Sequence, residues 1–137
     1  MQAANFKLTA ARYLAINTTE LDLHNDYEFV SLKFDVSNQV VELIWCRCAS
    51  SGKLRNLPQS VSLRCEGVTF FLASPADQSL PISESLCLSS IGYQSNEIAG
   101  QFWVEEEPDD QWAWSIQFQS GAQFQIRGSQ AYAKIEP

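Results

Sequence analysis

The stretch IAGQFWVEEEPDDQWAWSIQF, residues 98–118, holds three of the chain's four tryptophans on the two sides of an acidic turn. Apolar and polar side chains alternate before and after this turn, which is typical of β-strands, because successive side chains in a strand point to opposite faces. Both apolar sets share one face when Val104 lies opposite Trp112 and Phe102 opposite Trp114, since a slip of one residue would turn one set over. The stretch therefore predicts a hairpin with an odd-length loop centred on Pro108.

An even register is the alternative for this hairpin. It would pair Trp103 with Trp114, but it would also place Trp112 opposite Glu105. We therefore expect the odd register, in which Trp103 points away from the aromatic face.

A third strand is predicted over residues 122–127. Ser120 and Gly121 form a turn signal, and Gly121 suits a position with positive φ. Matching the apolar faces puts Phe118 opposite Phe124 and Ile116 opposite Ile126. The result is a meander with one aromatic face and one polar face, and the polar face collects Gln101, Trp103, Ser115, Gln117, Gln119, Gln123, Gln125 and Arg127.

The rest of the chain also alternates with a period of two. Strands are expected over 28–36, 41–45, 60–65, 68–72 and 86–93, with Gly67 as a bulge. The side chains predicted to face the core are Val30, Leu32, Phe34 and Val36, then Val41, Leu43 and Trp45, then Val61, Leu63 and Cys65, and after the bulge Val68, Phe70 and Leu72. Such spacing favours a single all-β domain over residues 1–137, an antiparallel sandwich or barrel of about seven to nine strands.

The N-terminal segment fits two structures. Phe6, Ala10, Tyr13 and Leu14 lie on one helical stripe, whereas Phe6, Leu8 and residues 13–16 would also serve as a strand. We expect a short helix there.

Composition narrows the class of function. The chain has 137 residues, 45% hydrophobic residues and a net charge of −7, so it should fold as an acidic globular domain. Nucleic acid is not an expected partner, because nucleic-acid binding needs a basic patch. No apolar run approaches the ~18 residues of a membrane helix, so no membrane association is expected.

The cysteines and the single histidine bear on compartment and metal binding. Cys46, Cys48, Cys65 and Cys87 show no CxxC spacing, and we expect them to be reduced thiols in a cytoplasmic protein. One histidine gives too few ligands for a typical zinc site. We therefore expect neither a metal nor another cofactor.

Two parts of the chain resemble small bacterial all-β proteins, some of which are immunity proteins against secreted toxins. The first part is LHNDY at 23–27, followed by VSLKFD at 30–35 and VELIW at 41–45, and the second is WSIQFQSG at 114–121. In that group a His-Asp pair precedes the first amphipathic strand, while here Asn25 separates His24 from Asp26. The resemblance implies an all-β binding protein and assigns no functional residue.

His24 and Asp26 are candidates for a general base and its orienting carboxylate, with Ser31 or a cysteine as nucleophile. Neither a nucleophile elbow nor a glycine-rich phosphate loop is present in the sequence. A lone histidine before a strand is more often a turn or capping residue. We therefore expect a protein that is not an enzyme.

The acidic turn and the Trp103 face are the candidate binding features. The turn lacks the glycine of a calcium loop, so it is either a solvated tip or a contact for a basic protein through Glu105, Glu107, Asp109 and Asp110. Trp103, with Gln101, Gln117 and Arg127, offers a ring and polar donors of the kind that bind sugars. The same face could instead be covered by the chain itself or by a second subunit.

The sequence thus predicts a non-catalytic binding protein, of immunity or adaptor type, with a basic protein partner. The alternative is a small-ligand or carbohydrate-binding domain that uses the Trp103 face. A homodimer through the exposed sheet face is a further possibility.

Overall fold

The computed structural model of the chain describes residues 1–49, 56–94 and 113–137. They form an all-β fold, as predicted, with three sheets that are not closed into a barrel. The strands are β1 (Gln2–Ala3), β2 (Lys7–Ala10), β3 (Tyr13–Ile16), β4 (Thr19–Asp22), β5 (Tyr27–Asp35), β6 (Val40–Arg47), β7 (Ser60–Glu66), β8 (Phe70–Ser74), β9 (Leu88–Gln94), β10 (Ala113–Phe118), β11 (Gln123–Arg127) and β12 (Gln130–Glu136); one 3₁₀ helix, η1, spans Ile82–Ser85.

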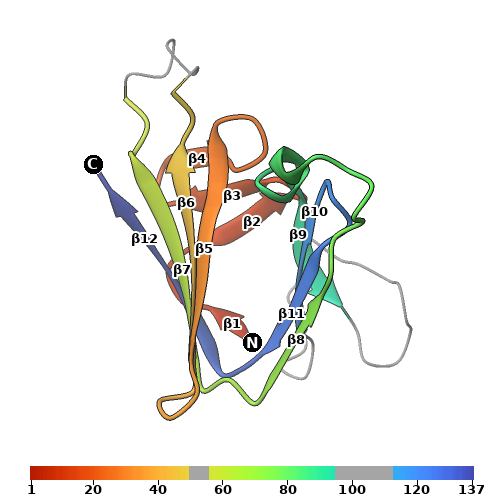
Figure 1. Cartoon of the computed structure of the whole chain (residues 1–137). Helices are drawn as coiled ribbons and strands as arrows, with labels where there is room; N and C mark the ends of the chain where they lie inside the picture. Colours follow the sequence, from red (N-terminus) through yellow and green to blue (C-terminus); the bar gives the residue numbers. More distant parts are fainter. Residues whose placement is uncertain (50–55, 95–112) are drawn as a thin grey trace.

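Two sheets face each other across the core (Figure 1). One has the strand order β1-β12-β7-β6-β5 and the other β8-β11-β10-β9. The predicted inward residues of the central strands are confirmed, because Val41, Leu43, Trp45, Val61, Leu63, Cys65, Trp114, Ile116 and Ile126 are all fully buried. The third sheet, β2-β3-β4, packs into the same core through Leu8, Leu14, Ile16 and Leu21.

The predicted N-terminal helix is wrong, because residues 2–16 contain the three strands β1, β2 and β3 and no helix. A two-residue turn at Asn17 and Thr18 joins β3 to β4, with Ile16 paired to Thr19, and Asn17 adopts a φ of 55° that asparagine tolerates. The structure of this segment therefore follows the alternation of its apolar and polar side chains and not their helical spacing. Phe6 nevertheless reaches the core, where its ring meets Trp114 edge-on at a centroid distance of 5.3 Å.

The predicted pairing of Trp114 with Phe102 is also wrong. Trp114 lies opposite Tyr93 of β9 on one side and opposite Ile126 of β11 on the other, so both edges of β10 are already paired. Residues 98–104 lie outside the described residues. The next predicted pairing, between β10 and β11, is off by two residues, since Ile116 pairs with Phe124 and not with Ile126. A slip of two keeps every side chain on its expected face.

The β10–β11 turn explains this slip. The Phe118 N–H donates to the Ala122 carbonyl at 2.9 Å, which leaves a three-residue loop, and Gly121 has a φ of 84°. This is the positive φ expected at Gly121, in a shorter loop than the sequence predicted.

A bulge at Val30 shifts the phase of β5. Phe29 pairs with Trp45 whereas Ser31 pairs with Ile44, so Val30 is an extra residue on this strand. The prediction that Val30 faces the core is therefore wrong: its side chain is 56% exposed, and Phe29 packs against the core instead. Leu32 packs against the core as predicted.

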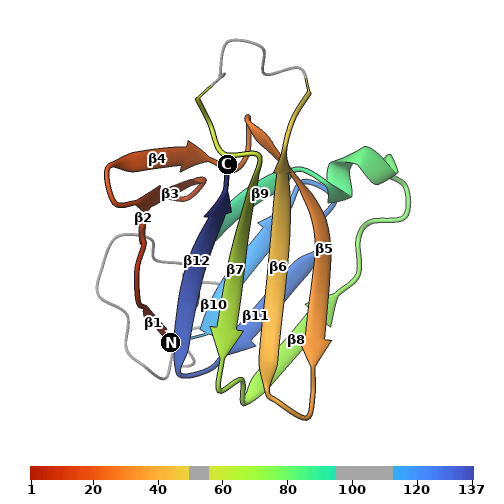
Figure 2. The ribbon, with the colours of Figure 1, turned by 90° about the vertical axis from the view of Figure 1, so that its left-hand side faces the viewer.

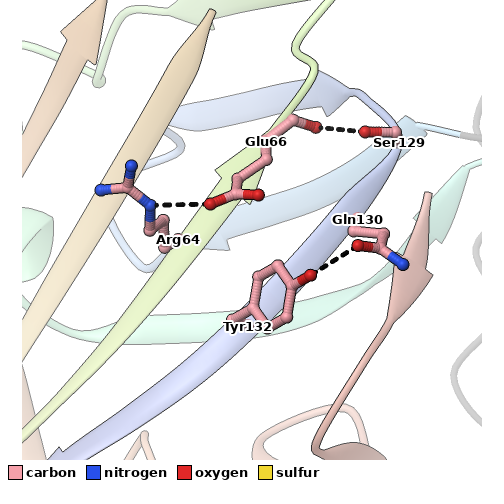
Figure 3. A network of polar contacts seen from close by, with 5 residues as sticks. All are labelled: Arg64, Glu66, Ser129, Gln130 and Tyr132. Carbon is pink, nitrogen blue, oxygen red and sulfur yellow. Dashed lines mark hydrogen bonds and ion pairs between the residues drawn. The ribbon is translucent and has the colours of Figure 1, made fainter. Parts of the chain in front are cut away.

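The chain passes from one main sheet to the other at a corner next to Gly67. β7 pairs with β12 in one sheet and β8 pairs with β11 in the other, so the same two segments run side by side through both sheets. At the corner, residues 67–69 lie against residues 128–129, and the Ser129 N–H and hydroxyl both donate to the Glu66 carbonyl (Figure 3). Three residues span the corner between the sheets, where the sequence predicted a bulge of one residue. Phe71 therefore faces the core, whereas Phe70 and Leu72, which were predicted to face it, lie on the outer face and are exposed.

The outer face of the five-stranded sheet is polar. Arg64 and Glu66 form an ion pair with an Nε–Oε1 distance of 3.0 Å, and the Tyr132 hydroxyl donates to Gln130 (Figure 3). Both pairs lie between residues two apart on one strand, which is the spacing that places side chains on the same face.

Candidate functional site

Two of the eight predicted binding residues lie in the described part of the chain. Gln117 on β10 and Arg127 on β11 are both half-buried on the outer face of the four-stranded sheet. The ladder pairs Gln117 with Gln123, and Arg127 lies four residues further along β11. The other six, Gln101, Trp103, Glu105, Glu107, Asp109 and Asp110, lie outside the described residues, and their roles stay predictions.

Serine and glutamine side chains on this outer face bond to one another. Ser115 accepts hydrogen bonds at Oγ from Gln123 Nε2 at 2.8 Å and from Gln117 Nε2 at 3.4 Å, and the Ser90 hydroxyl donates to Gln117 Oε1 at 3.4 Å. Ser115 is fully buried. At the other end of the face, Arg127 lies over the Phe70 ring, with 5.3 Å between the guanidinium carbon and the ring centroid. The polar face is therefore a connected network at its centre.

His24 lies beside Cys87, a nucleophile candidate that only the fold brings near it. The Cys87 Sγ is 3.4 Å from His24 Nδ1, while His24 Nδ1 is 2.5 Å from the Leu88 carbonyl oxygen. A carbonyl oxygen can only accept, so His24 Nδ1 must carry its proton and is not a base toward the thiol. Burial, reinforced by Glu84, raises the pKa of Cys87, although Arg12 opposes this shift. Cys87 is therefore a neutral thiol at neutral pH.

The predicted partner of His24, Asp26, serves the turn before β5. The backbone N–H groups of His24 and Asn25 both donate to Asp22 Oδ1 at 3.0 Å, and the Asp26 N–H donates to the Asp22 carbonyl. Burial alone would raise the pKa of Asp22, but the hydrogen bonds that Asn25 and His24 donate to its carboxylate lower that pKa. The His24 region thus has the geometry of a turn, as its position before a strand predicts.

All four cysteines are free thiols. Cys65 is buried, and burial raises its pKa to about 12, whereas Cys46, Cys48 and Cys87 are half-buried. Within the described ranges, no group of three or more histidine, cysteine, aspartate and glutamate side chains is arranged to hold a metal ion.

The most distinctive surface of the described structure is apolar. Of its ten exposed large hydrophobic side chains, eight lie on β5, on β8 or on the segments that directly follow these strands; we name this set the β5–β8 surface, and its members are Val30, Phe34, Val36, Phe70, Leu72, Leu80, Ile82 and Leu86. Ile82 is 86% exposed and Val36 is 71% exposed. A soluble domain rarely gathers apolar side chains on one side without a binding role.

The two strands of this surface belong to different sheets and meet at their edges. β5 ends the five-stranded sheet and β8 ends the four-stranded sheet. Across the gap, the rings of Phe34 and Phe71 lie 5.2 Å apart, and the Phe29 N–H donates to the Leu86 carbonyl. Figure 2 shows β5, β8, η1 and the connection between β8 and η1 on one side of the molecule, with the β2-β3-β4 sheet on the other.

Carboxylates lie along this surface. Asp35 precedes Val36, Asp77 accepts the Leu80 N–H at its carbonyl, and Glu84 is in η1. Hydrogen bonds from Asn38 and Ser37 lower the pKa of Asp35, and those from Ser79 lower the pKa of Asp77. Both carboxylates therefore stay ionised below the pH at which an ordinary aspartate is protonated.

Sequence reasoning missed this surface because it assigned Val30, Phe34, Val36, Phe70 and Leu72 to the core. Knowing that β5 and β8 lie at sheet edges would have indicated this surface. Edge position, however, depends on the order in which strands pair and not on the sequence of the strand itself.

The part of the chain that the structure describes contains no helix long and apolar enough to span a membrane. Comparisons with protein-family models, with curated proteins and with solved structures found no match to this chain.

Proposed function

We propose that this protein acts without catalysis, by binding a partner protein at the β5–β8 surface. The observation that carries the proposal is the concentration of exposed apolar side chains on β5, on β8 and on the segments that follow them, with Ile82 at 86% and Val36 at 71% exposure. Burying one aliphatic side chain of this size on binding is worth roughly 1.5–3 kcal/mol. A partner that covers several of them gains a large part of the free energy of a stable complex.

The proposed contact is made by side chains and not by an added strand. Free sheet edges invite strand addition, and proteins block it with bulges, charged residues and prolines. β5 carries the Val30 bulge and Lys33, and Pro75 directly follows β8. Both edges therefore have features that disfavour a further strand, while their apolar side chains stay accessible.

The partner segment is proposed to be basic as well as apolar. Asp35, Asp77 and Glu84 flank the apolar side chains, and the lowered pKa of Asp35 and Asp77 keeps them charged. The whole chain has a net charge of −7, which accelerates association with a basic protein. Lysine or arginine next to aliphatic residues would match this surface.

The geometry around His24 supports a non-catalytic role. Its Nδ1 is engaged with the Leu88 carbonyl and the neighbouring Cys87 thiol has a raised pKa. A cysteine nucleophile needs the opposite shift, toward the thiolate.

The test uses two labelled peptides with identical leucine and isoleucine positions, one with lysine and one with glutamate between them, and measures fluorescence anisotropy. The lysine peptide should bind, and binding should weaken with added salt. Ile82→Glu and Leu72→Glu should each weaken it by about tenfold or more. The matched control is Tyr132→Glu, since Tyr132 is also exposed but lies on β12.

Two outcomes would overturn the proposal. One is equal affinity for both peptides, or binding that Ile82→Glu leaves unchanged. The other is self-association, detected by sedimentation and abolished by Leu72→Glu, which would identify the occupant as a second copy of this chain.

Within this class, an immunity-type protein of the bacterial cytoplasm is our specific proposal. The resemblance at residues 23–45 and 114–121 supports it, and four free thiols suit a reducing compartment. A toxin encoded next to this chain should be inhibited by it, and Ile82→Glu should abolish that inhibition. Full inhibition by Ile82→Glu would count against the surface.

A further inference from the structure

The structure contains a surface depression of about 630 Å³ that is lined by residues near the C-terminus. Figure 2 shows the C-terminus at the end of the five-stranded sheet where β6 ends and β7 begins. Its lining comes from five parts of the chain: Thr19 at the start of β4, Arg47 at the end of β6, residues 56–59 before β7, Ile135 in β12, and Pro137. None of these residues belongs to the β5–β8 surface. The depression is thus a separate candidate site.

Arg47 gives this depression its charge. The side chain is half-buried, and its Nη1 donates to the Leu57 carbonyl at 2.8 Å. In the described residues no carboxylate forms an ion pair with it. A guanidinium has five N–H donors in a planar fork, so donors remain for an acceptor in the depression.

The backbone around Arg47 is held in place by hydrogen bonds. The Arg47 N–H donates to the Gln59 carbonyl at 2.8 Å, and the buried Tyr27 hydroxyl donates to the Pro58 carbonyl at 2.8 Å. Tyr27 also pairs with Arg47 across the β5–β6 ladder. Residues 57–59 are therefore fixed to the two strands that position the guanidinium.

The remaining lining has two kinds of groups. Thr19, Asn56 and Gln59 supply a hydroxyl and two amides, whereas Leu57, Pro58, Ile135 and Pro137 supply apolar contact. A cation with nearby neutral donors suits an anionic group, and arginine with a carboxylate is the strongest such pair. The apolar residues suit a short hydrocarbon body next to that group.

From these observations we infer that the depression binds the carboxylate of a small apolar organic acid, with Arg47 as its anion partner. The carboxylate could belong to a free acid or to the C-terminus of a peptide. The inference is independent of the proposed protein-binding surface.

The test titrates the full ¹⁵N-labelled chain and follows its amide resonances. The probes are hexanoate with hexanamide as its neutral partner, and acetyl-leucine with acetyl-leucine amide. The acids should give saturable shifts at Arg47, Leu57 and Gln59, and the amides should not. A response to hexanoate alone would assign a free-acid site, and a stronger response to acetyl-leucine would assign a peptide C-terminus.

Two variants and two controls make the test decisive. Arg47→Gln should weaken binding by about tenfold to a hundredfold, as expected for the loss of a charged hydrogen-bond donor. Ile135→Glu places a carboxylate in the lining from an exposed position, so it should abolish binding without unfolding the chain. Arg64→Gln and Ile82→Glu are the matched controls, because neither residue lines the depression.

Equal shifts with the acid and the amide would overturn the inference. Unchanged binding by Ile135→Glu would also overturn it, even where Arg47→Gln fails to fold. Because Ile82→Glu tests the β5–β8 surface and Ile135→Glu tests the depression, each proposal can fail without the other.

Discussion

Gly128 and Gly67 are neighbours at the corner between the two main sheets. Replacing either one by alanine would add a methyl group, and this group would meet different atoms at the two positions. A Cβ at Gly128 would lie 2.8 Å from the Glu66 carbonyl oxygen, which is backbone, whereas a Cβ at Gly67 would collide with the Ser129 side chain, which can rotate. Gly67 has a φ of 62°, which adds strain for any other residue. The corner therefore depends on glycine for close approach at one position and for backbone conformation at the other.

We expect Gly128→Ala to destabilise the fold by about 1–3 kcal/mol, because the Glu66 carbonyl must move and its bond from the Ser129 N–H weakens. Urea unfolding followed by circular dichroism measures this loss. Gly121→Ala is the control: its φ of 84° costs about 1 kcal/mol, but its Cβ would meet only the Asp77 backbone nitrogen, at an ordinary contact distance of 4.0 Å. A smaller loss at Gly128 than at Gly121 would show that the corner can relax.

Tyr27 makes stability depend on alkaline pH. Burial raises its pKa to about 12 in the folded chain, above the value of about 10 in an unfolded chain. Folding therefore favours the neutral phenol, so this contribution is complete below pH ~10 and is lost as pH rises from about 10 through 12. Cys65, whose pKa is also raised to about 12, adds a loss of the same sign from about pH 9.

Tyr27→Phe should remove the Tyr27 part of this dependence. Between pH 10 and 12 the free energy of unfolding should fall less steeply by up to about 1.4 kcal/mol per pH unit, the value for one proton. At pH 7 the variant should be less stable by about 1 kcal/mol, because the hydrogen bond to the Pro58 carbonyl is lost. An unchanged alkaline slope would show that the phenol has the same pKa in the folded and the unfolded chain.

At the scale of the strands, side-chain alternation predicted faces well and partners poorly. It correctly predicted that Val41, Leu43 and Trp45 face the core, and that Trp114, Ile116 and Phe118 do so as well. The reason is that every second side chain of a strand lies on the same face, so a buried face leaves an apolar residue at every second position. Alternation did not predict β9 as the neighbour of β10, and it misplaced the pairing of β10 with β11 by two residues. It cannot detect such an error, because a shift by any even number of residues keeps every side chain on the same face. β12 was missed, although Ala131 and Ala133 alternate with polar residues there and are buried.

The candidate site was harder to predict than the fold. The β5–β8 surface arises because two strands with apolar sequences end up at sheet edges, and edge position depends on long-range pairing. The Arg47 depression likewise joins residues 19, 47, 56–59 and 135, which no local pattern connects. Bulges such as the one at Val30 add a change of phase that has no simple signature in this sequence.

The Val30 bulge gives a prediction for β5 as an element. Deleting Val30 would leave Phe29, Ser31 and Leu32 in regular alternation with the same residues facing the core. We expect the deletion variant to stay folded, with a flatter edge that self-associates more strongly. Sedimentation velocity measures the association, and Val30→Thr, which keeps the bulge, is the control. Equal association of the two variants would mean that the bulge does not protect this edge.

The two open sides of the sandwich are closed in different ways. On one side the β2-β3-β4 sheet enters the core, and the Ile91 N–H donates to the Ala11 carbonyl. On the other side the closure consists of aromatic rings, with Phe34 against Phe71 and Phe71 against Phe124. This asymmetry leaves the molecule with one sealed side and one apolar side available to a partner.

The corner beside Gly67 and Gly128 has a consequence for how the molecule comes apart. Because β7 continues into β8 and β11 into β12, two paired segments of the chain run through both main sheets. A sheet cannot open along this pair without straining the Glu66–Ser129 contacts at the corner. The amide hydrogens of β7, β8, β11 and β12 should therefore exchange with solvent at one common free energy of opening, so that the sandwich melts as a single cooperative unit and not sheet by sheet.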